Sequence, residues 1–309
     1  ILPSLFFKQI DQIINIFGSK EIFSIPVLSH NFEYDVDNLF EKYQSIKFSE
    51  KEESIGKQEL KKFGLKENDK FICLAVRDGA YNEKIKYYGL NIYSSHNDFR
   101  NYDIKSFESA ANALADRGYF VFRMGVKVSK PLVTNNKKII DYANSNLRNE
   151  FLDIYLGAKC NFCISTSMGF DDLPYIFNRP MGIMGVPIGD LRTHSERFYL
   201  ITKKHFDIKK NKNLSISEIF SRGLGFAYDQ KIFAKKNIRL IDYNSDEIKN
   251  FCLEACDYFE NKIAYDNQAE ALQKKFKSLF ASNLKKTDYR KQVKKPLKKI
   301  QGTIKSNFY

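Results

Sequence analysis

Short apolar segments alternate with amphipathic segments through the middle of the chain. The apolar segments are four to six residues long and predict buried strands at 71–76, 119–123, 138–141, 161–165, 181–186 and 238–242. Apolar residues at helical spacing predict helices at about 104–117, 149–158, 169–177, 215–222 and 245–261. This alternation is typical of a parallel sheet covered by helices on both faces. We therefore predict an α/β domain with a Rossmann-like, doubly wound parallel sheet.

Two further regions flank the predicted domain. Residues 4–17 place apolar side chains at helical spacing, and the highly charged stretch 43–70 predicts a short helix in a connection. We assign 1–67 to an N-terminal region plus linker, 68–265 to the Rossmann-like domain, and 266–309 to a basic C-terminal helix and tail. The last predicted helix of the domain begins at Asn244 or Ser245, with acidic residues in its first turn, where the helix dipole favours them.

The positive charge is concentrated in the tail. The chain has a net charge of +13, and residues 274–309 carry +11 of it, from twelve basic residues against one acidic residue. Residues 1–273 therefore hold only +2, which argues against a nucleic-acid-binding body, because such a body interleaves basic and aromatic residues on its surface. No apolar run approaches the roughly 18–20 residues of a membrane span, and no signal-peptide pattern opens the chain, so we expect a cytoplasmic protein.

The cysteines indicate neither a disulfide framework nor a metal centre. Five cysteines are few for a chain of 309 residues. Cys160 and Cys163 form a C-x-x-C inside an apolar stretch, but neither a second such pair nor a nearby histidine completes a tetrahedral zinc set. We predict no bound metal.

Polar residues follow three of the predicted strands, and ligands of doubly wound sheets bind beyond the carboxyl ends of strands. Arg77 and Asp78 follow the first strand, and Arg123 ends the second. The strand at 161–165 leads into Ser-Thr-Ser-Met-Gly (165–169), whose hydroxyls and N–H groups can cradle a phosphate or simply cap a helix. Because a guanidinium fork suits a diphosphate, Arg77 favours a nucleotide-diphosphate site. Dinucleotide, Walker and nucleophile-elbow motifs are missing from the sequence.

Several ordered segments resemble a family of bacterial glycosyltransferases whose genes typically lie in surface-polysaccharide or glycan loci. They are ICLAVRDGAY (72–81), HNDFRNYDI (96–104), ADRGYFVFRMG (115–125), IIDYAN (139–144), FLDIYLGAKCNFCISTSMGFDDLP (151–174) and NRP (178–180). The resemblance covers about residues 68–265. More distantly, AVRDG and ISTSMGFDDLP look like donor-binding elements of fucosyltransferase-like enzymes of the GT-B class. One departure is Ser167-Met168, where the family often has Gly-Ser or Gly-Thr.

The resemblance implies a metal-independent GT-B-like enzyme with two Rossmann-like domains, of which the C-terminal one binds the nucleotide sugar. Residues 1–67 are then an incomplete or reduced N-terminal domain. The expected donor-binding residues are Arg77, Asp78, Arg100, Arg123, Gly125, Ser165, Thr166, Ser167 and Gly169. The nucleotide-diphosphate sugar is a co-substrate, and we expect no cofactor besides it.

A catalytic base is harder to assign. An inverting transferase needs a group that takes the proton of the acceptor hydroxyl. His96, Asp98 and Asp103 are candidates, because they lie in the loop between the first strand and the helix at 104–117. Alternatively, Asp103 only caps that helix and His96 is a surface residue. In GT-B enzymes the base often comes from the N-terminal domain, which makes His30, Asp35 and Asp37 further alternatives.

The sequence thus predicts transfer of a sugar from a nucleotide-diphosphate sugar to a glycan, lipid-linked or protein acceptor. The alternative is a non-catalytic nucleotide-sugar-binding protein of the same fold. The tail adds a hypothesis about location: Leu272, Phe276, Leu279 and Phe280 form one apolar helix face flanked by lysines. Such a helix lies in a membrane interface or docks on the protein body. With the basic residues of 274–305, the first case would hold the protein at an anionic inner-membrane surface.

Overall fold

A computed structural model describes residues 46–81, 95–188, 196–227, 229–263, 266–284 and 303–304. These residues belong to one compact unit, Tyr34–Tyr309. The predicted helix at 4–17 lies outside the described residues.

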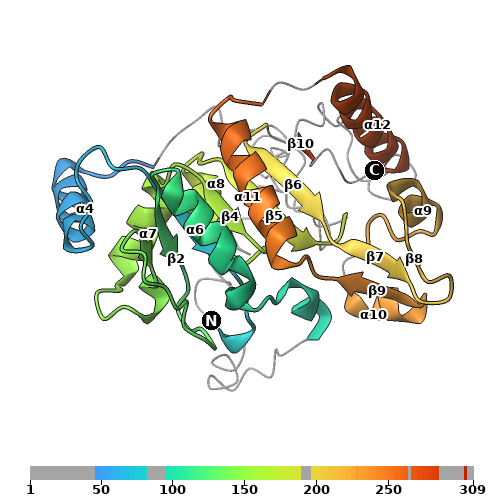
Figure 1. The fold of residues 1–309 in the computed structure, drawn as a ribbon, viewed down its shortest axis with the longest axis horizontal. Helices are drawn as coiled ribbons and strands as arrows, with labels where there is room; N and C mark the ends of the chain where they lie inside the picture. The colour runs from blue at the N-terminus through green and yellow to red at the C-terminus, as the bar shows by residue number, and fades with distance from the viewer. Residues whose placement is uncertain are drawn as a thin grey trace, which may run out of the picture. The chain divides into compact units, whose positions relative to one another are not determined.

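A parallel sheet forms the centre of this unit (Figure 1). Its strands are β1 (Phe71–Ala75), β2 (Phe120–Arg123), β3 (Ile139–Ile140), β4 (Cys163–Ser165), β5 (Met181–Val186), β6 (Phe198–Thr202) and β10 (Thr303–Ile304). They are hydrogen-bonded in the order β10-β6-β5-β4-β1-β2-β3. The chain runs outward from β1 to β3 and then returns to β4 on the other side of β1, so the direction of winding reverses between β1 and β4. Such a reversal opens a crevice at the carboxyl ends of the two strands.

Helices cover both faces of the sheet, which confirms the predicted Rossmann-like, doubly wound fold. The helical segments are α4 (Glu50–Lys62), η2 (Ser95–Arg100), η3 (Ile104–Phe107), α6 (Glu108–Asp116), η4 (Tyr142–Asn144), α7 (Glu150–Lys159), η5 (Gly169–Asp171), α8 (Asp172–Ile176), α9 (Ile216–Ser221), α10 (Gln230–Lys235), α11 (Ser245–Phe259) and α12 (Asn267–Leu284). Helices α6 and α11 pack against each other and bury apolar residues with Ile72, Leu74 and Val121 of the sheet. On the other face, α7 packs with α8 and α4. Strands buried on both faces explain the near-continuous apolar runs in the sequence.

Most predicted elements form where the sequence placed them. Helix α11 begins after Asn244, whose side chain accepts from the Glu247 N–H at 3.0 Å while the Glu247 carboxylate accepts from the Asn244 N–H. This reciprocal capping box fixes the predicted start of the helix. The predicted helix at 169–177 is instead a 3₁₀ turn, η5, followed by the five-residue α8.

The strand predicted at 238–242 does not belong to the parallel sheet. It forms β9 (Ile238–Ile241), which pairs antiparallel with β7 (Lys204–Asp207), and β7 also pairs with β8 (Lys212–Asn213). In the main sheet its place is taken by β6, a strand that the sequence analysis missed. The physical difference is burial: all five residues of β6 are buried, whereas β9 exposes Arg239 next to the buried Ile238, as in a sheet with one solvated face.

Helix α12 docks on the protein body. Phe276 is fully buried, Leu272 and Leu279 are half-buried, and the helix contacts α9. The side chain of Phe280 lies outside the described residues. Of the two alternatives for this apolar face, the structure therefore has the docked one, with Lys274 and Lys275 exposed beside it. Within the described part of the chain, no helix is long and apolar enough to cross a membrane.

Candidate functional site

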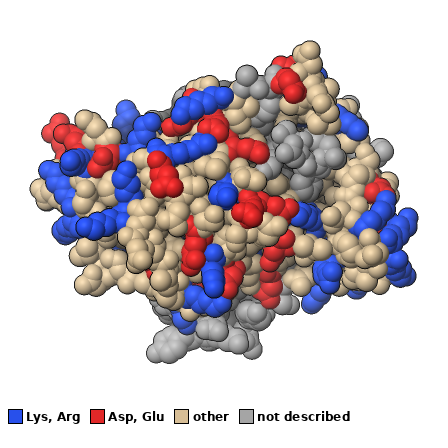
Figure 2. All heavy atoms as spheres, viewed as in Figure 1, with Lys and Arg blue, Asp and Glu red and all other residues tan. Residues whose placement is uncertain are grey.

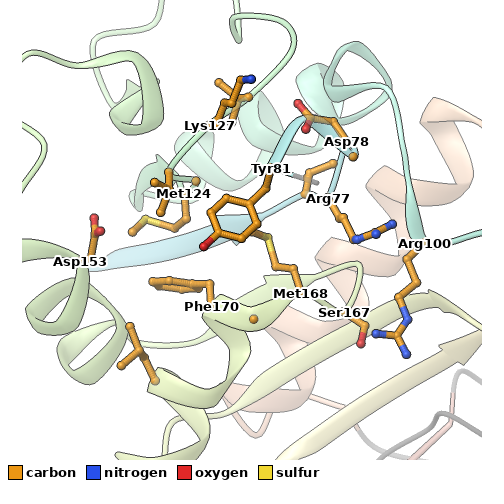
Figure 3. Close-up of a pocket in the computed structure, with 17 residues that line it drawn as sticks. Arg77, Asp78, Tyr81, Arg100, Met124, Lys127, Asp153, Ser167, Met168 and Phe170 are labelled. Carbon is orange, nitrogen blue, oxygen red and sulfur yellow. The ribbon is translucent and has the colours of Figure 1, made fainter. Parts of the chain in front are cut away.

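A cavity of about 490 Å³ opens at the carboxyl ends of β1, β2 and β4, where the winding of the sheet reverses (Figure 3). Three loops line it. The loop after β1 contributes Arg77, Asp78 and Tyr81, the loop after β2 contributes Met124, Gly125 and Lys127, and the loop after β4 contributes Ser167, Met168, Gly169 and Phe170. Arg100 of η2 and Asp153 of α7 complete the wall. The cavity therefore lies where doubly wound sheets bind ligands.

Hydrogen bonds between the loops set the shape of the cavity. The Arg77 N–H donates to Thr166 Oγ1 at 2.9 Å, and the Thr166 N–H donates to the Ala75 carbonyl at 3.0 Å. These two bonds tie the end of β1 to the end of β4. In the loop after β2, Gly125 has a φ of 156°, and a Cβ there would come within 2.7 Å of Val128 Cγ1. Thr166 thus holds two loops of the cavity wall together through its hydroxyl and its N–H group. Gly125 lets the loop after β2 adopt its conformation.

Two guanidinium groups stand at one end of the cavity. Arg77 Nη1 donates to the Asn97 carbonyl at 2.9 Å and also bonds Asn101 Oδ1, and the Tyr102 N–H donates to the Arg77 carbonyl at 2.8 Å. The segment around η2, which carries Arg100, is therefore fastened to Arg77. Figure 3 shows both arginines on the same side of the cavity as Ser167. Two cations in a partly buried site favour an anionic ligand group.

Arg123 takes a different position from the one predicted. Its side chain is fully buried, with Nη1 3.1 Å from Asp141 Oδ1 and Nη2 3.6 Å from Asp78 Oδ2. Burial lowers the pKa of the Arg123 guanidinium, and the two carboxylates counteract this. Arg123 is not among the residues that line the cavity, so here it holds loops together instead of facing a ligand.

Asp78 lines the cavity, but its carboxylate oxygens accept hydrogen bonds from the neighbouring loops. One oxygen accepts from the Ala80 N–H at 3.1 Å, and the other accepts from the N–H and hydroxyl of Ser129 at 2.6 and 2.9 Å. With the ion pair to Arg123, both carboxylate oxygens have partners. Asp78 therefore braces the loops after β1 and β2.

The turn after β4 is held by a carboxylate of its own chain. Buried Asp171 accepts from Ser165 Oγ at 2.5 Å and from the Met168 N–H at 3.2 Å, while the Ser167 N–H donates to Ser165 Oγ at 2.9 Å. Asp171 thus satisfies the Ser165 hydroxyl and the Met168 N–H, two of the donors that were predicted to cradle a phosphate. The predicted alternative, a helix cap from Ser165, Thr166 or Ser167, does not form, because the acceptor at this turn is the Asp171 carboxylate. Ser167 and Gly169 remain on the cavity wall, but Ser165 and Thr166 do not.

Ser167 adopts a backbone conformation that favours glycine. Its φ of 67° lies in the left-handed region, which is uncommon for residues with a Cβ. The family that the sequence resembles often has glycine at this position, so the departure noted in the sequence falls on the one residue of the turn with a positive φ. The turn forms with serine because the two bonds to Ser165 and Asp171 hold its ends.

Two of the predicted catalytic residues, Asp98 and Asp103, are not among the described residues that line the cavity. Asp103 caps η3 through the Lys105 N–H at 3.1 Å and pairs with Lys130 Nζ at 2.6 Å, which is the capping alternative. Asp98 Oδ1 accepts from Asn101 Nδ2 at 3.4 Å, so Asp98 supports the residue that holds Arg77. The side chain of His96 lies outside the described part of the structure, as do His30, Asp35 and Asp37.

Sequence reasoning missed Asp153, the other carboxylate on the cavity wall among the described residues. It lies in the first turn of α7, half-buried, with Oδ2 2.5 Å from Arg148 Nη2. Burial raises the pKa of the Asp153 carboxyl, and the charge of Arg148 opposes that rise. Figure 3 shows Asp153 on the opposite side of Tyr81 and Phe170 from the two arginines. No strand-end motif marks Asp153, because it enters the cavity from a helix.

The described residues hold no cluster of three histidine, cysteine or acidic side chains that could bind a metal ion. All five cysteines are buried free thiols. Cys163, the second cysteine of the C-x-x-C, pairs with Cys73 across the β4–β1 ladder and is fully buried.

No protein-family model and no curated protein matches the chain. A solved structure, that of E. coli ADP-heptose lps heptosyltransferase II, matches with a TM-score of 0.40 and 13% sequence identity. The match covers 71% of this chain and 54% of that chain, so the chain spans about half the length of the heptosyltransferase.

Proposed function

We propose that the protein is a glycosyltransferase that binds a nucleotide-diphosphate sugar in the cavity at the β1/β4 crossover. The observation that carries this proposal is the division of the cavity wall. Arg77 and Arg100 stand with Ser167 at one end, and Tyr81 and Phe170 lie next to them. The guanidinium groups suit a diphosphate, and the aromatic surfaces suit a base or sugar ring. The resemblance of residues 68–265 to bacterial glycosyltransferases supports the same assignment.

In the proposed reaction, the acceptor hydroxyl oxygen forms a bond to the anomeric carbon of the sugar, and the bond from that carbon to the diphosphate breaks. The leaving diphosphate takes the electron pair, and the charges of Arg77 and Arg100 stabilise it. A guanidinium carries five N–H donors, so Arg77 can serve Asn97, Asn101 and a diphosphate oxygen together. The proposal needs no metal ion, because the two guanidinium groups supply the positive charge.

We assign the general base to Asp153. Both oxygens of Asp78 accept hydrogen bonds from the loops, whereas the ion pair of Asp153 with Arg148 uses Oδ2. Asp153 also lies at the far end of the cavity from the arginines, which leaves room for an acceptor between it and the donor. A raised pKa makes a carboxylate a stronger base toward a hydroxyl proton. The acceptor class stays as predicted: a glycan, a lipid-linked glycan or a protein.

A panel of GDP, UDP, CMP, TDP and ADP, followed by thermal shift and calorimetry, tests the binding step, since a ligand of the native state raises its stability. Release of the nucleotide from the matching sugar donor then tests turnover. Asp153→Asn should bind the nucleotide as the wild type does and lose roughly 100-fold or more in turnover, as expected when a general base is removed. Asp116→Asn, which changes an exposed carboxyl on α6, is the matched control.

Three outcomes would each contradict a part of the proposal. If no nucleotide in the panel binds, the donor assignment fails. If a nucleotide binds but the wild type releases none from any sugar donor, with any acceptor tested, the protein is instead a non-catalytic nucleotide-sugar-binding protein. Full turnover by Asp153→Asn would remove Asp153 as the base and leave the binding site untouched.

We also propose that the basic residues of 274–305 favour an anionic inner-membrane surface. With Phe276 buried against the body, the contribution of α12 is electrostatic only, through exposed lysines such as Lys274 and Lys275. Such binding should weaken with added salt.

A further inference from the structure

The three-stranded antiparallel sheet differs in charge from the rest of the folded body. Residues 204–242, which contain β7, β8, β9, α9 and α10, hold nine basic and four acidic residues, a net charge of +5. Because residues 1–273 together carry only +2, the remainder of that stretch is at −3. Figure 2 shows lysine and arginine side chains gathered over the part of the molecule that contains β7, β8 and α9 in Figure 1. The positive charge of residues 1–273 is thus concentrated in 204–242, although their total is close to neutral.

One end of this sheet combines lysines with an exposed isoleucine. The turn between β7 and β8 is Ile208-Lys209-Lys210-Asn211, and residues 208–213 are all exposed. The Ile208 N–H donates to the Asn237 carbonyl at 3.0 Å, which brings Lys235 and Lys236 at the end of α10 to the same end of the sheet. We call Ile208, Lys209, Lys210, Lys235 and Lys236 the hairpin end.

The turn is rigidly held. Asp207 is buried, and its Oδ1 accepts from the N–H groups of Lys209 and Lys210 at 2.9 and 3.1 Å. Asp207 Oδ2 pairs with Arg222 Nη1 at 2.7 Å. The Asp207 carboxylate thus binds two backbone N–H groups and Arg222. It forms no ion pair with the side chains of Lys209 and Lys210, which are exposed to solvent.

The charges of the hairpin end are not neutralised. Within the described residues, no carboxylate forms an ion pair with Lys209, Lys210 or Lys235, whereas Lys212 pairs with Glu218 at 2.7 Å. Lys236 Nζ donates to the Arg222 carbonyl, which leaves its charge uncompensated. Ile208 keeps 55% of its surface exposed. A fixed apolar side chain surrounded by unpaired lysines is the pattern of a membrane-interface contact.

We propose that the hairpin end docks on an anionic lipid surface, with Ile208 entering the interface and the four lysines above it contacting lipid headgroups. An exposed isoleucine favours lipid over a soluble polyanion, because a nucleic acid or another anionic polymer would gain little from it. Nucleic-acid surfaces instead present aromatic side chains for base stacking. The inference does not depend on the proposed enzymatic activity.

Sedimentation of the full chain with vesicles tests the docking. The vesicles contain phosphatidylglycerol and phosphatidylcholine, and a second set contains phosphatidylcholine alone. Each basic residue near an anionic surface changes the partition by roughly fivefold, so Lys209→Gln with Lys210→Gln should weaken binding by about 25-fold. Lys51→Gln with Lys61→Gln on α4 removes the same charge from exposed positions and should weaken binding far less. Lys274→Gln with Lys275→Gln measures the contribution of the tail helix separately.

Ile208→Ser separates lipid from a soluble polyanion. It should weaken binding to anionic vesicles by roughly tenfold, from the lost apolar burial, and leave binding to heparin unchanged. If the Lys209/Lys210 variant pellets like the wild type, or no more weakly than the α4 control, the proposal is wrong. It is also wrong if Ile208→Ser leaves vesicle binding intact while the lysine variant loses heparin, because the surface then serves a soluble polyanion. A circular-dichroism melt of each variant confirms folding, and Ile208→Val, a milder change, replaces Ile208→Ser if that variant unfolds.

Discussion

Arg77 and Arg123 both stand at the carboxyl end of a strand in the same sheet, yet they occupy opposite environments. Arg77 lies two residues beyond β1 and lines the cavity, whereas Arg123 is still paired with Leu74 within β2 and is buried with Asp78 and Asp141. A residue within a strand must point to one face of the sheet, whereas a residue beyond the strand can turn into the crevice. A position near the end of a strand therefore places a residue at the carboxyl edge of the sheet. Whether its side chain reaches the cavity depends on whether the residue lies beyond the last hydrogen-bonded pair of the strand.

The largest expected effect is on the buried side of this comparison. Arg123→Met keeps the length of the side chain but leaves Asp78 and Asp141 without their cation, and breaking a buried ion pair costs about 3–5 kcal/mol. Urea unfolding of the variant measures the loss. Adding Asp78→Asn and Asp141→Asn to Arg123→Met should recover part of it. Unchanged stability with lost nucleotide affinity would place Arg123 in the ligand site after all.

On the cavity side, Arg77→Ala should lower nucleotide affinity and spare the fold. Loss of a charge-assisted contact to the diphosphate costs about 1.5–3 kcal/mol of binding free energy, or roughly 10- to 100-fold in Kd by calorimetry. Arg77→Lys should recover only part of the affinity, because an ammonium lacks the planar fork. Arg239→Ala, at an exposed position on β9, is the control. Equal affinity of Arg77→Ala and wild type would sink the diphosphate assignment.

A smaller effect is expected where the turn after β4 is held by its own carboxylate. Asp171→Asn removes the charge that accepts from Ser165 Oγ and the Met168 N–H, and should lower the stability by about 1–2 kcal/mol. Nucleotide affinity should change less than it does in Arg77→Ala, because Asp171 is buried behind the cavity wall. The opposite ranking of the two variants would mean that the turn, and not the arginine end, is the anion site.

The fold could be predicted from the sequence much further than the site could. Continuous apolar runs identify strands buried on both faces, as in β1 and β5, and capping residues such as Asn244 fix the helix starts. The pattern could not tell which sheet the strand at 238–242 joins, because that depends on its neighbours. The rest of the site depended on pairings at long range. Arg123 meets Asp78 across 45 positions of sequence, and Asp153 enters from a helix with no strand-end signal.

The smallest expected effect is that of Gly169→Ala, which changes ligand binding and protein stability in opposite directions. Gly169 lines the cavity, its φ is not positive, and a Cβ built there meets no atom within 4 Å. Gly169→Ala is thus free of strain, and it should raise the stability of the nucleotide-free protein by about 0.4–1 kcal/mol, because it reduces the freedom of the unfolded chain. The added methyl group occupies space at the ligand, so affinity should fall, by less than in Arg77→Ala. Thermal melts and calorimetry on the same sample measure both quantities. A variant that gains stability and binds nucleotide as tightly as the wild type would show that the ligand lies away from the turn, toward Arg77 and Arg100 alone.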